Sequence, residues 1–448
     1  MKLQRIMRAA AALVAAATLA SCNQWLTASD AEANPNQPTA ASIDQLFVGA
    51  QTTLTLEYTS DLARTVCMWM QQCAGTDRQY KDLGRYVYGE DGFDVSFEDV
   101  YTGGGLIDIR KMEALADAAG DQVYGGVARV LEAMEIGIAA DVWGDVPFSE
   151  AVSDVVKPKL DPQQDVYVAV QAKLDTAITM LGSGTGKGPG VQDIYYGGNA
   201  AKWVRLAHTL KARYYLHTVE KLGNAGYASA LAQAQQGLQP SDDLLGIAGA
   251  NPQSNNTWYQ FVVIQRAGYL SAGKNLVDLL KAQNDPRLAL YYSKNAAGEY
   301  QGAPPNTQQN STISVLNEST RIKADFQQPL VTWAENQLII AEAALQTGNS
   351  GLALQAYNAE RTAAGVPTAT SVTLADIMTE KYIALFQNTE VWNDWKRTCL
   401  PALTPAQGTT GGIPERLLYA QSERNTNPNI PLPSDQPVRN WNDPAGCS

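Results

Sequence analysis

Two aspartates, Asp141 and Asp145, lie four residues apart beside Gly144 and Pro147. A pair of carboxylates can supply the acid and the base of glycoside hydrolysis. Glycine and proline also end helices, however, and Asp side chains commonly accept backbone N–H bonds at such ends. Nothing else in the sequence indicates a pocket that would raise the pKa of an acid. We therefore interpret both aspartates as structural and expect no catalytic residue.

Metal ligation is the second chemistry to consider, and the chain has two histidines. His208 and His217 are nine residues apart on one predicted helix, so at 100° per residue they point to opposite faces. They cannot share a metal, which disfavours a zinc site or a His-based triad. Glu90, Asp91 and Asp94 could attract calcium but match no calcium-loop signature, and we interpret them as turn residues. We expect no metal and no cofactor.

A glycine-rich segment at 181–188 has the sequence LGSGTGKG and is similar to a phosphate-binding loop. Leu181 stands where that loop needs its first glycine, and Gly188 stands where Ser or Thr must reach Mg²⁺. No strand is predicted before it. We therefore expect a flexible linker between two helices.

Aromatic residues are concentrated in the predicted loops. Rings in loops offer flat apolar faces that stack on the C–H surfaces of sugars, while polar side chains bind the hydroxyls. Packing beneath the loop is the alternative for each ring. The candidate ligand-binding residues are Trp69, Tyr80, Tyr86, Tyr101, Trp258, Tyr259, Arg266 and Tyr300.

The segments between these loops carry apolar residues at helical spacing, and alternating strand patterns are scarce. We therefore predict a mainly α fold with long loops at about 75–105, 240–270 and 291–330. Helices are predicted at 43–57, 108–119, 122–140, 166–181, 200–222, 228–238, 274–283, 333–347, 351–364 and 374–396.

Several of these helices form consecutive pairs, which is typical of helical-hairpin repeats. In the clearest pair, Ala341, Gly348, Ala353 and Tyr357 stand at the offsets of a tetratricopeptide repeat. Small side chains at those offsets let two helices approach closely. With looser pairs at 203–237, 122–181 and 374–396, we predict about four tetratricopeptide-like hairpins that form a scaffold, with loop-rich insertions that carry the ligand site.

The N-terminus is typical of an exported lipoprotein. Three basic residues precede an apolar run at 9–20 that is too short to span a bilayer, and the segment Leu19-Ala20-Ser21-Cys22 resembles a lipobox. Ordinary cleavage beside an incidental cysteine is the alternative. We predict a signal peptide at 1–21, lipid attachment at Cys22, a polar tether at 22–41 and a single domain at 42–448.

Composition limits the function. The formal charge of −12 becomes −15 once residues 1–21, with three positive and no negative charges, are removed. An acidic chain is a poor match for nucleic acid. The chain has five cysteines, and export permits disulfides. The nearest pairing joins Cys67 to Cys73 and Cys399 to Cys447, with buried free thiols as the alternative.

Motifs spread along the mature chain resemble those of the SusD/RagB family of surface nutrient-binding proteins. The most recognisable is DVWGDVPFSEA at 141–151. Others are NPNQPT at 34–39, IDQLF at 43–47, DPRL at 285–288, AEAA at 341–344, EKYIALF at 380–386, WNDWKRT at 392–398, IPERL at 413–417 and NTNPN at 425–429. Cys399 and Cys447 depart from the pattern and suggest a bridge specific to this chain.

The resemblance implies an outer-membrane lipoprotein on the cell surface that passes an oligomeric nutrient to a SusC-like TonB-dependent transporter. Glycans are the expected ligands, and peptides are the alternative within the family. A carboxylate-dependent glycoside hydrolase and a scaffold that binds only protein are the other hypotheses. Trp392 and Trp395 lie three residues apart on a predicted helix, and we expect them to pack in the core.

Overall fold

The computed structural model describes residues 41–409, 411–444 and 446–447. The chain divides into two compact units, Met1–Gln45 and Leu46–Ser448. The predicted signal peptide, Cys22 and all but residue 41 of the predicted tether lie outside the described residues. Among the residues that are described, no helix is both long enough and apolar enough to cross a membrane.

Helices make up most of the second unit, and α3 (Ile43–Thr59) begins just before it. The helices that follow are α4 (Asp61–Trp69), α5 (Arg78–Leu83), α6 (Asp94–Tyr101), α7 (Leu106–Ala119), α8 (Gln122–Trp143), α9 (Gln163–Ser183), α10 (Ala200–His217), α11 (Val219–Leu222) and α12 (Asn224–Ala234). The later ones are α13 (Thr257–Tyr259), α14 (Lys274–Ala282), α15 (Arg287–Tyr291), α16 (Trp333–Gln346), α17 (Ser350–Ala363), α18 (Leu374–Ala384), α19 (Glu390–Thr398) and α20 (Gln421–Thr426).

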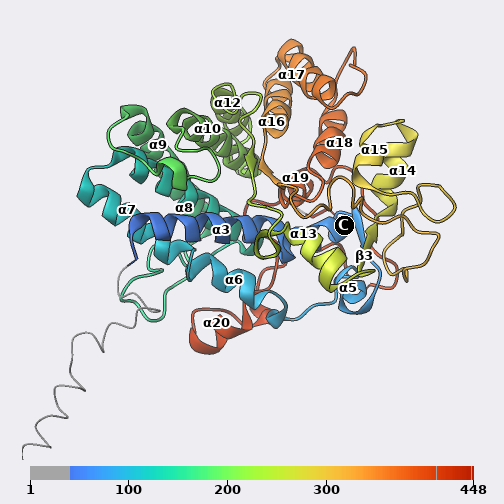
Figure 1. The fold of residues 1–448 in the computed structure, drawn as a ribbon, viewed down its shortest axis with the longest axis horizontal. Helices are drawn as coiled ribbons and strands as arrows, with labels where there is room; N and C mark the ends of the chain where they lie inside the picture. Colours follow the sequence, from blue (N-terminus) through green and yellow to red (C-terminus); the bar gives the residue numbers. More distant parts are fainter. Residues whose placement is uncertain (1–40, 410, 445, 448) are drawn as a thin grey trace, which may run out of the picture. The chain divides into compact units, whose positions relative to one another are not determined.

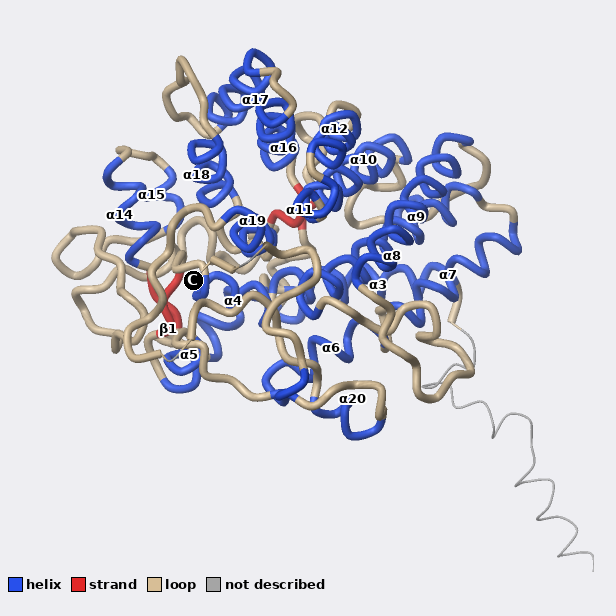
Figure 2. The backbone as a smooth tube through the Cα atoms, turned by 180° about the vertical axis from the view of Figure 1, so that it is seen from behind, coloured by secondary structure: helices blue, strands red, loops and turns tan. Residues whose placement is uncertain are grey.

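The long helices pack as successive hairpins, as predicted. The hairpins are α8 with α9, α10 with α12, α16 with α17, and α18 with α19. Neighbouring hairpins also touch, because α9 packs on α10, α12 on α16, and α16 on α18. Both views show α9, α10, α12 and α16 following one another in this order (Figure 1, Figure 2). The prediction of a mainly α fold built on tetratricopeptide-like hairpins is confirmed.

The α16–α17 hairpin shows why this sequence folds in this way. Thr332 and Asn349 cap the two helices by accepting the backbone N–H groups of Glu335 and Leu352, which supplies partners that the first turn lacks. Gly348 closes the turn at φ +84°, a conformation that favours glycine. The small Ala353 is fully buried, so the helices can approach closely.

Two of the predicted helices are interrupted. The segment 374–396 contains α18 and α19, separated at Gln387, whose φ of +66° no right-handed helix can contain. Likewise α10 ends at His217 and α11 follows after Thr218. The apolar periodicity continues across both breaks because both parts face the same core, so the period alone could not show them.

Two of the three predicted loop regions are also partly helical. The segment 75–105 contains α5, the 3₁₀ turn η1 (Glu90–Phe93) and α6, while 240–270 contains η3 (Pro252–Ser254), α13 and the π-helical turn η4 (Gln260–Gln265). Helices this short bury too few residues to show a period. In the segment 291–330, β4 (Pro329–Val331) is the one element that the structure describes.

Two short ladders join distant parts of the chain, and two disulfides join segments that are 6 and 48 residues apart. Strand β1 (Cys73–Gly75) pairs antiparallel with β3 (Leu270–Ala272), and β2 (Leu244–Leu245) pairs with β4. Cys67 bonds Cys73 at 1.99 Å, and Cys399 bonds Cys447 at 2.15 Å. The first bridge holds the end of α4 to β1, and the second holds the end of α19 to the C-terminal segment.

Trp392 and Trp395 on α19 are each 1% exposed. Trp392 donates its indole N–H to the carbonyl of Pro414 at 2.9 Å and lies 5.4 Å, centroid to centroid, from Trp69. Both rings therefore belong to the core, as the sequence predicted. Aromatic pairs of this kind stabilise cores beyond the area that they bury.

Candidate ligand-binding site

The three predicted loop regions meet beside the β1–β3 ladder. The backbone N–H of Thr76 donates to Tyr269 at 2.9 Å, and that of Gln309 donates to Thr76 at 3.2 Å. The side chain of Ser271 also bonds that of Gln309. Figure 2 shows loops gathered around β1 and α5. Segments that are about 190 to 230 residues apart in sequence thus form one surface.

Tyr80 lies at the centre of a cluster of aromatic rings beneath this surface. Its ring lies 4.6 Å from that of Phe261 and 6.0 Å from that of Tyr269, and the Arg64 guanidinium lies 4.4 Å from the Phe261 ring centroid. Arg64 Nε donates to the Tyr80 hydroxyl at 3.0 Å. Burial raises the pKa of Tyr80 to about 12, so its hydroxyl keeps its proton at neutral pH.

Two hollows flank the segment 85–88 that follows α5, and we call them the paired hollows. One, of about 280 Å³, is lined mainly by α5 and residues 87–93, and Tyr80 and Leu83 belong to it. The other, of about 360 Å³, lies between residues 85–88 on one side and residues 408–409 and 411–414 on the other. Val87 and Tyr88 line both hollows, and Val87 is 59% exposed.

Ring contacts and hydrogen bonds connect the aromatic residues at the floor of the paired hollows. Trp69 lies 6.5 Å from Tyr86 and 5.5 Å from Tyr88, and its indole N–H donates to Leu83 at 3.0 Å. Tyr88 donates its hydroxyl to the carbonyl of Arg416 at 3.2 Å. The Tyr86 hydroxyl accepts the N–H of Ala406 at 3.1 Å. Such bonds hold the rings in place before any ligand binds.

The structure corrects the assignment of Trp69 and Trp258 as ligand-contacting residues. Both side chains are fully buried, at 0% exposure, so neither ring can present a face to a ligand. Trp69 supports the hollows from below, while Trp258 follows Asn256, whose side chain caps α13. The sequence could not separate a ring in a loop from a ring beneath a loop, because both look alike in composition.

The other candidates lie in different surroundings. Tyr101 packs on Phe97 at 5.3 Å and its hydroxyl is buried, which also makes it a packing residue. Arg266 is exposed and lies 5.8 Å from the Tyr269 ring. Tyr259 and Tyr300 are half-buried. Tyr80 and Tyr86 are therefore the two candidates that line the paired hollows.

The lining also contains residues that were not predicted as ligand-binding residues, among them Arg85, Val87 and Tyr88. Arg85 pairs with Asp82, and its Nε is buried without a hydrogen-bond partner among the described residues. The signal in the sequence was the run of Arg and Tyr at 85–88. The sequence could not show that residues 408–409 and 411–414, about 320 residues away, lie opposite this run.

Two of the three acids considered for calcium, Glu90 and Asp94, have protein partners. Glu90 binds Arg424 through both carboxylate oxygens at 2.7 and 2.8 Å. Asp94 accepts the backbone N–H groups of Gln421 and Ser422 at the start of α20. Together these contacts hold α20 against η1 and α6. Both carboxylates therefore have structural roles.

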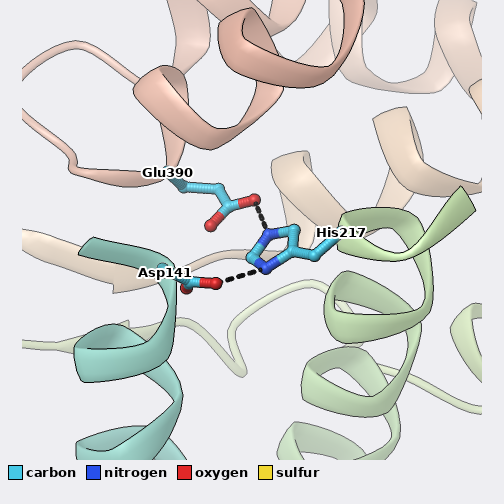
Figure 3. A group of neighbouring side chains, drawn as sticks. All are labelled: Asp141, His217 and Glu390. Carbon is cyan, nitrogen blue, oxygen red and sulfur yellow. Dashed lines mark hydrogen bonds and ion pairs between the residues drawn. The ribbon is translucent and has the colours of Figure 1, made fainter. Parts of the chain in front are cut away.

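A buried set of charges, which the sequence did not reveal, joins three hairpins (Figure 3). His217, at the end of α10, contacts Asp141 Oδ1 through Nδ1 at 2.8 Å and Glu390 Oε1 through Nε2 at 2.6 Å. Asp141 lies on α8 and Glu390 on α19. Burial alone would lower the pKa of His217, but the two carboxylates raise it to about 10.

These three side chains place candidate ligand atoms within 4.8 Å of one another, as a metal site would. Both ring nitrogens of His217 are engaged by carboxylates, however. An imidazole that donates from both nitrogens has no lone pair left for a metal. The geometry therefore describes an imidazolium bridging two carboxylates, not a metal centre.

Asp141 and Asp145 have structural partners. Asp141 also accepts the Tyr167 hydroxyl at 2.5 Å. Asp145 accepts the backbone N–H of Gln163 at 2.8 Å, at the start of α9. The side chain of each aspartate therefore fixes the position of a neighbouring helix.

This fold defines a class of mainly α-helical proteins in which tetratricopeptide-like hairpins carry long insertions. The family that matches residues 35–365 is the SusD-like family, described as starch-binding and associating with the outer membrane. The match covers more than half of the chain, so the chain belongs to the SusD-like family. No curated protein matches it.

Several solved structures are similar. A chitin-binding protein is 21% identical with a TM-score of 0.76, and the match covers 89% of this chain and 100% of that one. A chitin-binding SusD homolog from Flavobacterium johnsoniae is 18% identical with a TM-score of 0.76, covering 90% and 99%. A SusD/RagB family protein from Bacteroides thetaiotaomicron is 21% identical with a TM-score of 0.74, covering 87% and 95%. At these identities the structures establish the fold.

Proposed function

We propose that this protein is a lipid-anchored, surface-facing nutrient-binding protein of the outer membrane that captures an oligosaccharide and delivers it to a SusC-like TonB-dependent transporter. The paired hollows beside Val87 carry the proposal. They combine half-buried tyrosine rings with an arginine and with backbone groups of a glycine-rich segment. Rings can stack on sugar faces while the polar groups bind hydroxyls.

A glycan is favoured over a peptide because two structural neighbours bind chitin. A catalytic role is disfavoured because Asp141 and Asp145, the carboxylates considered for glycoside hydrolysis, are engaged in the fold. Chitin and starch oligosaccharides on a glycan array, run beside a peptide library, test the ligand class. A turnover assay on every glycan that binds tests for hydrolysis.

Substitutions in the paired hollows should weaken ligand binding without unfolding the protein. Val87 is exposed and lines both hollows, so Val87→Trp places a bulky ring in the ligand's space. Arg85→Ala removes the polar partner. We expect each variant to weaken binding roughly 10- to 100-fold, or about 1 to 3 kcal/mol. Isothermal titration calorimetry with the array's best glycan measures this.

The matched control is Val191→Trp, since Val191 is 91% exposed and lines neither hollow. It should bind like the wild type. Melting temperatures of all three variants should stay close to that of the wild type, because surface substitutions change stability little. Unchanged binding by both Val87→Trp and Arg85→Ala would exclude the paired hollows as the site.

Loss of the lipid-bearing residue should release the protein from membranes. We expect Cys22→Ala to remain folded but to appear in the soluble fraction, because the predicted polar tether separates the anchor from the folded part. Membrane fractionation with and without detergent measures the partition. A variant that still fractionates wholly with membranes would contradict lipid attachment at Cys22.

A further inference from the structure

A third hollow, of about 680 Å³, lies among α15, the segment 319–327 and the end of α17. Its apolar lining includes Leu290, Phe326 and Ala363, and its cations are Arg287, Arg321 and Lys323. The Thr320 hydroxyl bonds the carbonyl of Leu290, which fixes the segment to α15. We call this the Arg321 hollow.

Arg321 is held from behind by aromatic rings. Its guanidinium carbon lies 4.9 Å from the ring centroid of Phe326, 5.4 Å from that of Tyr291 and 5.6 Å from that of Phe386. Nε donates to Gln387 Oε1 at 3.2 Å and Nη2 to the carbonyl of Phe386 at 3.0 Å. These contacts fix the plane of the guanidinium.

The rest of the guanidinium is unused. Nη1 of Arg321 makes no hydrogen bond within the described part of the chain, and no described carboxylate lies within 4.0 Å of the side chain. Three of the five N–H donors of an arginine are thus free. Burial lowers the pKa of Arg321.

Arg287, the second cation of the lining, is already matched. It binds Asp285 at 2.6 Å and Glu380 at 2.5 Å, and Arg361 also binds Glu380 at 2.6 Å. Burial, together with the neighbouring Glu380, raises the pKa of Glu360 to about 8. Arg287 also lies 3.5 Å from Glu360, so each of the two arginines already has a carboxylate partner.

Lys323, the third cation, faces Asp325 at 3.9 Å, and both side chains are more than half exposed. Among the described residues that line the hollow, Arg321 is therefore the one cation without a carboxylate within 4.0 Å. An oriented guanidinium with free N–H donors, beside apolar walls, suits a ligand that carries a planar anion next to an apolar surface.

We propose that the Arg321 hollow binds the carboxylate of a uronic acid residue, with Arg321 as the donor and the apolar walls against the sugar carbons. The choice of a carboxylate rests on Arg321, whereas the choice of a sugar rests on the proposed function. The protein is thereby selective for acidic glycans over their neutral counterparts. Because the chain as a whole is negatively charged, the attraction for a carboxylate comes from Arg321 itself and not from the net charge of the protein.

Calorimetry with trigalacturonic acid and its carboxyl-reduced trimer tests the proposal on wild type, Arg321→Gln and Lys111→Gln. Lys111 is an exposed cation on α7, so its substitution matches the change in net charge. The wild type and Lys111→Gln should bind the acidic trimer about 10- to 100-fold more tightly than the reduced one. Arg321→Gln should lose that preference, and thermal melts confirm that it is folded.

Arg321→Lys supplies a second check if the glutamine variant proves unstable. It keeps the charge but loses the planar donor edge, so it should recover only part of the preference. Equal binding of both trimers by the wild type overturns the acidic-glycan inference and leaves oligosaccharide binding intact. A preference that persists in Arg321→Gln places the carboxylate elsewhere. Binding of neither trimer also overturns this inference, while the glycan array decides the proposed function separately.

Discussion

Replacing His217 with glutamine should lower the free energy of unfolding by about 3 to 5 kcal/mol. The imidazolium sits between Asp141 at 2.8 Å and Glu390 at 2.6 Å, and all three side chains are buried. Without it, the negative charges of two carboxylates lose their shared counter-ion in a place that water does not reach. The positive charge of Arg213, 3.7 Å from Glu390, offsets only part of this loss.

The chain contains its own control. His208 lies on the same helix but is half-buried and bonds Gln233 at 2.7 Å. His208→Gln should therefore cost less than about 1 kcal/mol. Urea unfolding followed by circular dichroism gives both values. Equal losses for the two variants would show that His217 does not bridge the hairpins.

The same histidine should make stability depend on pH. In the folded state the pKa of His217 is raised to about 10, whereas an unfolded histidine titrates near 6.5. The folded state therefore binds the extra proton, and the stabilisation is complete below about pH 6.5 and disappears as pH rises towards 10. The stability of the wild type should fall relative to that of His217→Gln across this window. Parallel curves would contradict the raised pKa.

Removing Arg397 should have a comparable effect on the last two hairpins. Arg397 and Lys381 face Glu342 and Asp394, with Lys381 3.0 Å from each carboxylate, and all four side chains are at most 5% exposed. Burial by itself would raise the pKa of Asp394, but Lys381 and Arg397 lower it to about 2. Arg397→Met leaves one carboxylate unmatched, and we expect a loss of about 3 to 5 kcal/mol.

A double-mutant cycle separates this electrostatic loss from a packing defect. Glu342→Met removes the principal partner of Arg397, and in the double variant the Lys381–Asp394 pair remains neutral. The double variant should therefore lose at least about 1 kcal/mol less than the sum of the single losses. Lys274→Met, which breaks the half-exposed Lys274–Asp278 pair, should cost under about 1 kcal/mol. Additive losses in the cycle would contradict the network.

The sequence predicted the hairpin scaffold well because helices are local. The spacing of Ala341 and Ala353 and the turn at Gly348 specify a tight helical pair within about 30 residues. Trp392 and Trp395 likewise showed their core role by helical spacing. The break at Gln387 was missed because both helices that it separates bury their apolar faces in one core.

The candidate site was less predictable, since it is made by pairing distant segments. The sequence indicated aromatic loops, and Tyr80 and Tyr86 do line the paired hollows. It could not show that Trp69 and Trp258 lie beneath the surface, because exposure depends on what packs above a ring. The sequence also could not show that residues 408–409 and 411–414 lie opposite Arg85.

The sequence by itself determined the helical-repeat class, because apolar and small residues recur at helical spacing along the chain. Its motifs indicated the family by resemblance. Only the tertiary structure decided which charges meet. His217 contacts Asp141, 76 residues away, and Glu390, 173 residues away, whereas Arg321 has no carboxylate partner among the described residues. Electrostatic partners are chosen by distance in space and by exclusion of water, and neither quantity is written in local sequence.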